Sequence, residues 1–151
     1  MMNSPFGTTI FCDDIREEVG GKSSYMGIYK GEMIVATDFP VILPMFAFAI
    51  TYVEPIDLPT MPVTIRVTLP DPTNTALIEI ELPIEQLRAE FIKTVDPDSI
   101  LFQSTLDFKA SPLLIAQEGS IKVSAIRNGE EIRLGSLKIR KAEPSEMKIQ
   151  L

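Results

Sequence analysis

Carboxylates carry most of the site chemistry that this sequence allows, because histidine is absent from all 151 residues. Without an imidazole, the chain lacks the general base of Ser-His-Asp and Cys-His hydrolases and the nitrogen ligand of His-bearing zinc and iron sites. Its single thiol, Cys12, precedes Asp13 and Asp14, and neighbouring negative charges disfavour the reactive thiolate. Cys12 is therefore expected to be a small buried residue of the first strand.

The candidates for a metal site are acidic residues of the kind that bind a hard cation such as Ca²⁺, namely Asp13, Asp14, Glu17 and Asp71. If the strands run up and down, the turn after the first strand and the turn at Asp71 share one end of the domain. The spaced Asp-x-Asp-x-Asp-Gly pattern of a Ca²⁺ loop is absent, and Arg16 can neutralise its neighbours. We therefore interpret these residues as solvated turn acids and expect neither a metal nor a cofactor. A Ca²⁺-dependent or carbohydrate-binding site at this acidic end is the alternative.

A second pair of carboxylates, Glu79 and Glu81, projects from one face of an expected strand about 7 Å apart, a spacing that glycoside hydrolases use. Charges at adjacent same-face positions usually keep a strand soluble, and no aromatic platform for a sugar lies beside them in the sequence. Hydrolysis by this pair is the third alternative, and we expect the protein not to be an enzyme.

The charge of the chain disfavours two classes of partner. A formal net charge of −7 and a pI near 4.6 oppose the phosphates of nucleic acids and anionic membranes. The longest apolar run, residues 39–53, is interrupted by Pro40 and Pro44 and is shorter than the ~20 residues of a membrane helix. A single cysteine and a start without the pattern of a signal peptide favour a reducing compartment, so the expected location is cytoplasmic.

Alternating apolar and polar residues predict an all-β fold, a two-layer antiparallel β-sandwich of Ig-like or C2-like type, with about nine strands and at most one short helix. The helix is expected at residues 84–91, where Ile84, Leu87 and Phe91 recur about once per turn. We expect a sandwich domain at residues 1–141 and a C-terminal tail at 142–151. The expected strands are residues 8–15, 22–30, 33–36, 45–53, 63–69, 77–82, 100–109, 120–127 and 130–141.

The clearest local signal is Asn128-Gly129, a dipeptide typical of a two-residue type I′ hairpin turn. Folding the chain there sets Arg127 opposite Glu130, Ala125 opposite Ile132 and Val123 opposite Leu134. Beyond Leu134 the alternation breaks, since Leu137 would fall on the wrong face. An extra residue at or next to Gly135, a β-bulge, restores it.

Part of the chain resembles a family of small uncharacterised bacterial and phage-encoded β-sandwich proteins. The resemblance lies in Cys12-Asp13-Asp14-Ile15-Arg16, Gly21-Lys22 and Gly27-x-Tyr29, in Asp38-Phe39-Pro40 with Leu43-Pro44, and in Leu134-Gly135-Ser136-Leu137. It covers mainly the first third and the last twenty residues. It implies the sandwich fold and implies no activity.

These observations predict a non-enzymatic protein-interaction or assembly module, bacterial or phage-related, that binds a protein partner or a second copy of itself. A mean hydropathy of +0.16 suggests apolar surface that a partner covers. In the tail, Met147, Ile149 and Leu151 would share one face of an extended segment, which could dock on an open strand edge.

Overall fold

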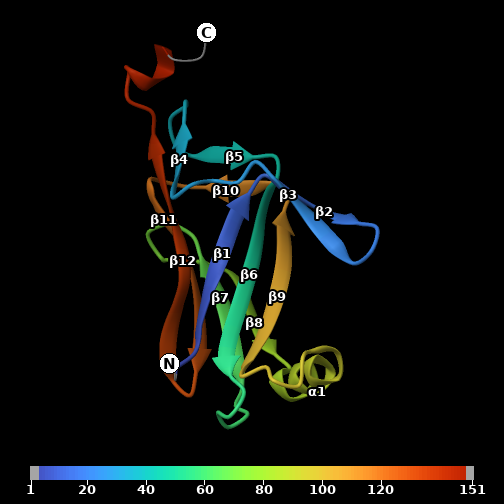
Figure 1. The fold of residues 1–151 in the computed structure, drawn as a ribbon. Helices are drawn as coiled ribbons and strands as arrows, with labels where there is room; N and C mark the ends of the chain where they lie inside the picture. The colour runs from blue at the N-terminus through green and yellow to red at the C-terminus, as the bar shows by residue number, and fades with distance from the viewer. Residues whose placement is uncertain (1–3, 149–151) are drawn as a thin grey trace.

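The protein is built almost entirely of strands, as its computed structural model shows for residues 4–148 (Figure 1). This confirms the all-β prediction. One α-helix, α1 (Ile84–Thr94), occupies the expected place and runs three residues further, and a short 3₁₀ turn, η1, covers Glu146–Lys148. The strands are β1 (Phe6–Cys12), β2 (Asp14–Glu18), β3 (Lys22–Met26), β4 (Glu32–Val35), β5 (Val41–Leu43), β6 (Phe46–Pro55), β7 (Val63–Thr68), β8 (Ala76–Leu82), β9 (Leu101–Ala110), β10 (Leu113–Ile115), β11 (Gly119–Arg127) and β12 (Glu130–Lys141).

The strands of the described region pair into four sheets, instead of the two layers expected. A three-stranded sheet has the order β1-β6-β9, a five-stranded sheet the order β4-β12-β11-β7-β8, and two-stranded ribbons are formed by β2 with β3 and by β5 with β10. All pairs are antiparallel except β4 with β12, which are parallel. The expectation of a purely antiparallel sandwich is therefore wrong at this edge.

The β2–β3 ribbon arises because the segment between β1 and β6 is broken more often than predicted. The expected strand at residues 8–15 divides at Asp13, whose backbone N–H bonds to the carbonyls of Met26 and Gly27. The expected strand at residues 22–30 ends at Met26, because Gly27 has a φ of 69°. As a result, β2 and β3 are short strands that pair with each other and turn away from the main sheets.

The core lies between the three-stranded and five-stranded sheets, which contribute to one cluster of buried side chains. Strand β6 provides its aromatic part with Phe46, Phe48 and Tyr52, all fully buried. On its other face β6 carries Ala47 and Ala49, and the β2–β3 ribbon packs over them with Ile15 and Tyr25. The run at residues 45–53 is apolar on both faces because each face is covered, as expected of a central strand.

The hairpin of β11 and β12 has the predicted turn and the predicted bulge. Asn128 and Gly129 have φ values of 51° and 76°, as a type I′ turn requires. The register shifts between Val123 and Ser124, so that Val123 faces Gly135 and Leu134 is the extra residue. The expected pairing of Val123 with Leu134 is therefore wrong by one position. The bulge keeps both Leu134 and Leu137 buried.

Replacing Gly129 by valine should lower the free energy of unfolding by about 1 kcal/mol or more, because a β-branched residue resists a positive φ. A Cβ at this position would meet no atom within 4 Å, so the effect reports backbone conformation alone. Gly129→Asn is the matched control and should be nearly neutral, since asparagine tolerates this conformation. Equal denaturation midpoints for the valine variant and the parent would contradict the assigned turn.

The segment after β12 is tied to the end of that strand by an ion pair. Arg140 donates to both carboxylate oxygens of Glu146, at 2.7 and 2.8 Å, and the backbone from Glu146 to Lys148 forms the 3₁₀ turn. The expectation of an extended tail is therefore wrong for these residues, because the ion pair holds a turn. Ile149 and Leu151, the other two members of the predicted apolar stripe, lie outside the described residues.

Candidate functional site

The acidic residues singled out near the start of the chain are each engaged by a different neighbour. Asp13 accepts a hydrogen bond of 2.6 Å from the hydroxyl of Tyr29. Asp14 accepts one of 2.8 Å from the backbone N–H of Ile15 and forms an ion pair with Lys109 at 3.1 Å. The Lys109 contact, with the backbone bond, lowers the pKa of Asp14. These carboxylates fasten the β2–β3 ribbon to its surroundings.

The remaining two candidates have local roles as well. Glu17 accepts a hydrogen bond of 3.2 Å from the hydroxyl of Ser23 on the paired strand. Asp71 lies in the turn between β7 and β8, where it accepts hydrogen bonds from the backbone N–H groups of Thr73 and Thr75 at 3.0 and 2.9 Å. Hydrogen bonds from Thr75 and Thr73 lower the pKa of Asp71. This is the geometry of an Asx turn.

The structure does not bring Asp71 together with Asp13, Asp14 and Glu17. The β2–β3 ribbon projects to the side in Figure 1, away from β7 and β8. Within residues 4–148, no three His, Cys, Asp or Glu side chains assemble in a way that could hold a metal ion. Sharing an end of the fold is not sufficient for a ligand set, because the turns belong to different sheets.

Glu79 and Cys12, the next two residues considered for chemistry, also make contacts within the fold. Glu79 forms an exposed ion pair of 2.9 Å with Arg66 on the neighbouring strand. Cys12 is fully buried, and its Sγ donates to the carbonyl of Asp14 at 3.4 Å. Burial, and then the negative charge of Asp13, raise the pKa of this thiol. The expectation of a buried Cys12 is confirmed.

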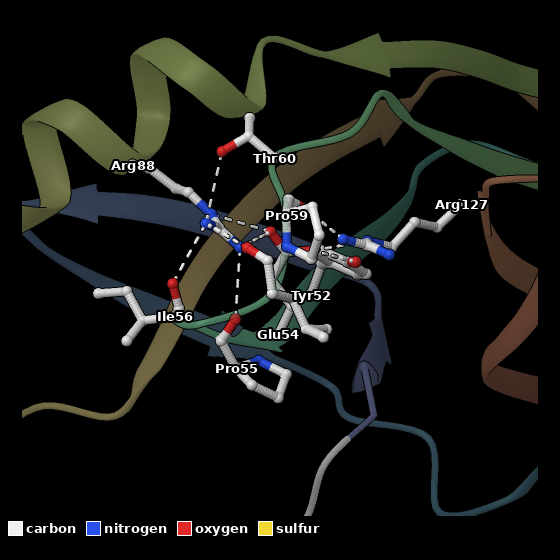
Figure 2. A network of polar contacts seen from close by, with 9 residues as sticks. Tyr52, Glu54, Pro55, Ile56, Pro59, Thr60, Arg88 and Arg127 are labelled. Carbon is white, nitrogen blue, oxygen red and sulfur yellow. Dashed lines mark hydrogen bonds and ion pairs between the residues drawn. The ribbon is translucent and has the colours of Figure 1, made fainter.

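The most extensive polar constellation was not predicted and centres on Glu54 at the end of β6 (Figure 2). Its carboxylate is fully buried. The hydroxyl of Tyr52 donates to Oε2 at 2.7 Å, and Arg88 of α1 donates to Oε1 through Nε at 3.0 Å and Nη2 at 2.7 Å. Arg127 of β11 donates to Oε2 from its Nε at 3.2 Å. One carboxylate therefore joins β6, α1 and β11.

The same two arginines hold the segment that comes after β6. Arg88 donates through Nη1 to the carbonyls of Ile56 at 3.3 Å and Leu58 at 3.0 Å, and Arg127 donates to the carbonyl of Pro59. Burial, and the bond to Glu54, raise the pKa of the Tyr52 hydroxyl. Because Glu54 is sealed from solvent, its carboxylate organises the fold by joining these elements.

A charge at the end of a long apolar run was the only signal in the sequence for this network. Glu54 directly follows the apolar stretch at residues 45–53, and a charged residue continuing a buried strand needs a partner. The identity of the partners, Arg88 and Arg127, had no local signature. They lie 34 and 73 residues away along the chain.

Comparison with known proteins assigns the chain to a family. A family model described as a family of unknown function, DUF6941, matches residues 8–140. The chain belongs to this family. The DUF6941 match runs from β1 into β12 and includes Glu54, Arg88 and Arg127. No curated protein and no solved structure matches the chain. The expectation of an uncharacterised family is confirmed at this level.

In this DUF6941 protein, exposed aliphatic side chains are distributed unevenly. We call the end formed by β2 to β5, β10, their connections and η1 the capped end (Figure 1). Among the described residues, eight of the eleven large exposed hydrophobics lie there: Val19, Met26, Ile28, Ile34, Ile42, Met45, Leu114 and Met147. The other three, Ile80, Ile92 and Ile100, lie on β8, on α1 and before β9.

The β5–β10 ribbon presents the most regular part of this apolar surface. Ile42 and Leu114 are directly opposite each other in the register, with exposed fractions of 66% and 53%. Their neighbours Leu113 and Ile115 point the other way and are buried in the core. The ribbon is therefore anchored on one face and apolar on the other.

Within residues 4–148, no helix is long and apolar enough to cross a membrane.

Proposed function

We propose that the protein is a non-enzymatic protein-interaction or assembly module, bacterial or phage-related, that binds a protein partner through the capped end. The observation that carries this proposal is the gathering of exposed aliphatic side chains there, with the Ile42–Leu114 pair at its most regular point. Exposed apolar side chains gathered at one end of a small domain are typical of a protein contact.

The architecture of the ribbon favours a contact of useful strength. Leu113 and Ile115 of β10 are fixed in the core, and this fixes the orientation of Leu114 between them. A backbone that is already held in place loses little conformational freedom on binding, which lowers the entropic cost of association. Full burial of an aliphatic side chain contributes about 1.5–3 kcal/mol. The pair Ile42 and Leu114 therefore has the properties of a binding anchor.

The chemistry of the rest of the chain favours a protein as the partner. A net charge of −7 repels nucleic acids and anionic membranes, whereas it allows contacts between apolar faces. Glu54, the fully buried carboxylate of the described region, is neutralised by two arginines and cannot reach a substrate. A cytoplasmic location agrees with the free thiol of Cys12.

Site-specific photo-crosslinking in the native host tests this proposal. A photoreactive residue at position 42 is expected to give one discrete crosslinked species, identified by mass spectrometry as either another protein or a second copy of this chain. The matched control is the same residue at position 100, because Ile100 is 64% exposed and Ile42 is 66% exposed. Position 100 should give no such species. Equal crosslinking at both positions, or none at position 42, would contradict docking at the capped end.

A further inference from the structure

A hollow on the outer face of the five-stranded sheet combines cations and hydroxyl groups in a protein that is acidic overall. It has a volume of about 360 Å³ and lies over the β11–β12 hairpin at the bulge. Its polar lining consists of Ser120, Lys122, Ser124, Glu131, Arg133 and Ser136. None of these residues belongs to the capped end, so a ligand site in the hollow is independent of the proposed function.

The strand register explains why these side chains meet. Lys122 and Ser124 alternate with the buried Ile121, Val123 and Ala125, so both point outward. In the pairing of β11 with β12, Ser124 is opposite Arg133 and Lys122 is opposite Ser136. Directly opposite residues have their Cβ atoms about 5 Å apart. The two cations therefore flank the serine pair diagonally, and a short serine at each strand leaves the space between them.

The polar groups of the hollow are not used by the fold. Within residues 4–148, neither Lys122 nor Arg133 forms an ion pair, whereas Arg66, Arg88, Arg127 and Arg140 each do. Ser124 is 7% exposed and lines the hollow. Within the described residues, every fully buried side-chain oxygen has a hydrogen-bond partner. The Ser124 hydroxyl has no such partner there, so its oxygen is not fully buried. Because Ser124 lines the hollow, this hydroxyl opens into it.

The charge balance of the lining selects among anions. Two cations and three hydroxyl donors suit an oxyanion. Glu131, which also lines the hollow, opposes a second negative charge and offers an acceptor for an N–H group. A phosphate ester carries about −1.5 to −2 at neutral pH, whereas a carboxylate carries a single charge. A carboxylate next to an amide N–H, as at the end of a peptide, matches all of these groups.

We propose that the hollow between Lys122, Arg133 and the three serines binds the carboxylate of a peptide-like ligand, with Glu131 accepting from the adjacent amide N–H. Arginine pairs with such a carboxylate through two parallel hydrogen bonds, and lysine adds a point charge. Ser124 and Ser136 donate from the floor.

The test is a titration of the full ¹⁵N-labelled chain with N-acetylglycine at constant ionic strength and neutral pH, monitored by amide chemical shifts. Saturable shifts are expected at Ser120, Ser124 and Ser136, and N-acetylglycinamide, which lacks the charge, should cause none. Arg133→Met should weaken binding about tenfold, as for the loss of one charge-assisted contact. Lys138→Met removes a charge from the same strand outside the lining and should change the affinity less than twofold.

Several outcomes would overturn the proposal. Absence of saturable shifts, or equal shifts with the uncharged amide, would show that the hollow binds no carboxylate. Tighter binding of inorganic phosphate at the same ionic strength would contradict the selectivity assigned to Glu131. Equal losses of affinity for N-acetylglycine in Arg133→Met and Lys138→Met would show that the positive charges on this sheet face attract the anion without a specific site. The spectra of the free variants check that each remains folded.

Discussion

Glu54→Gln is expected to destabilise the protein by about 3 kcal/mol or more, since it removes the carboxylate that compensates the buried Arg88 and the largely buried Arg127. The carboxylate is fully buried, and the side chains of Arg88 and Arg127 are 10% and 12% exposed. Glutamine keeps the size of the side chain and can still bond to Tyr52, so the loss reports charge rather than a cavity. Urea unfolding at neutral pH measures it through the denaturation midpoint.

An exposed ion pair provides the control for this experiment. Glu79→Gln breaks the ion pair with Arg66. The side chain of Glu79 is 51% exposed and that of Arg66 is 40% exposed, so the free energy of unfolding should fall by less than about 1 kcal/mol. In Glu54→Gln the carbonyls of Ile56 and Leu58 also lose a well-oriented donor, so amide hydrogen exchange in the segment after β6 should accelerate. Equal free energies of unfolding for the Glu54 and Glu79 variants would contradict the stabilising role of the buried network. Unchanged amide exchange after β6 would show that the network does not hold this segment.

Features that depend on neighbouring residues were accessible from the sequence. The dipeptide Asn128-Gly129 specifies its own turn, and the break in alternation between Leu134 and Leu137 requires the bulge. The exact pairing at Val123 was off by one, because alternation shows that an extra residue exists without showing which side of Gly135 it occupies. Local geometry therefore predicted the hairpin, and tertiary packing fixed its register.

Features that depend on distant residues were not accessible in the same way. Asp13 and Asp71 were expected to share an end of the fold, yet they belong to different sheets and each has partners nearby. Glu54 has its partners 34 and 73 residues away, and a pattern of period two carries no information on such pairs. The hollow at Arg133 likewise depends on which residues face each other across β11 and β12 once the bulge has shifted the register.

Close packing beside the bulge leads to the second large effect, at Gly7 in β1. Strand β1 lies between β6, its hydrogen-bonded partner, and β12, and the hydroxyl of Thr9 donates to the carbonyl of Leu134 at 3.0 Å. The bulge directs Leu134 into the core, where its side chain approaches Gly7. A side chain at position 7 therefore has no free volume.

Gly7→Ala is expected to lower the free energy of unfolding by about 1–3 kcal/mol, the usual range for overpacking. Its methyl group would overlap the backbone carbonyl oxygen of Thr51 and lie 2.7 Å from Cδ2 of Leu134. Backbone atoms of a central strand cannot move aside as a flexible side chain does, so the strain spreads into β6. Thr8→Ala, at the adjacent exposed position of β1, is the matched control and should change stability by less than about 0.5 kcal/mol. Equal urea midpoints for the two variants would contradict the close approach of β1 to the bulge.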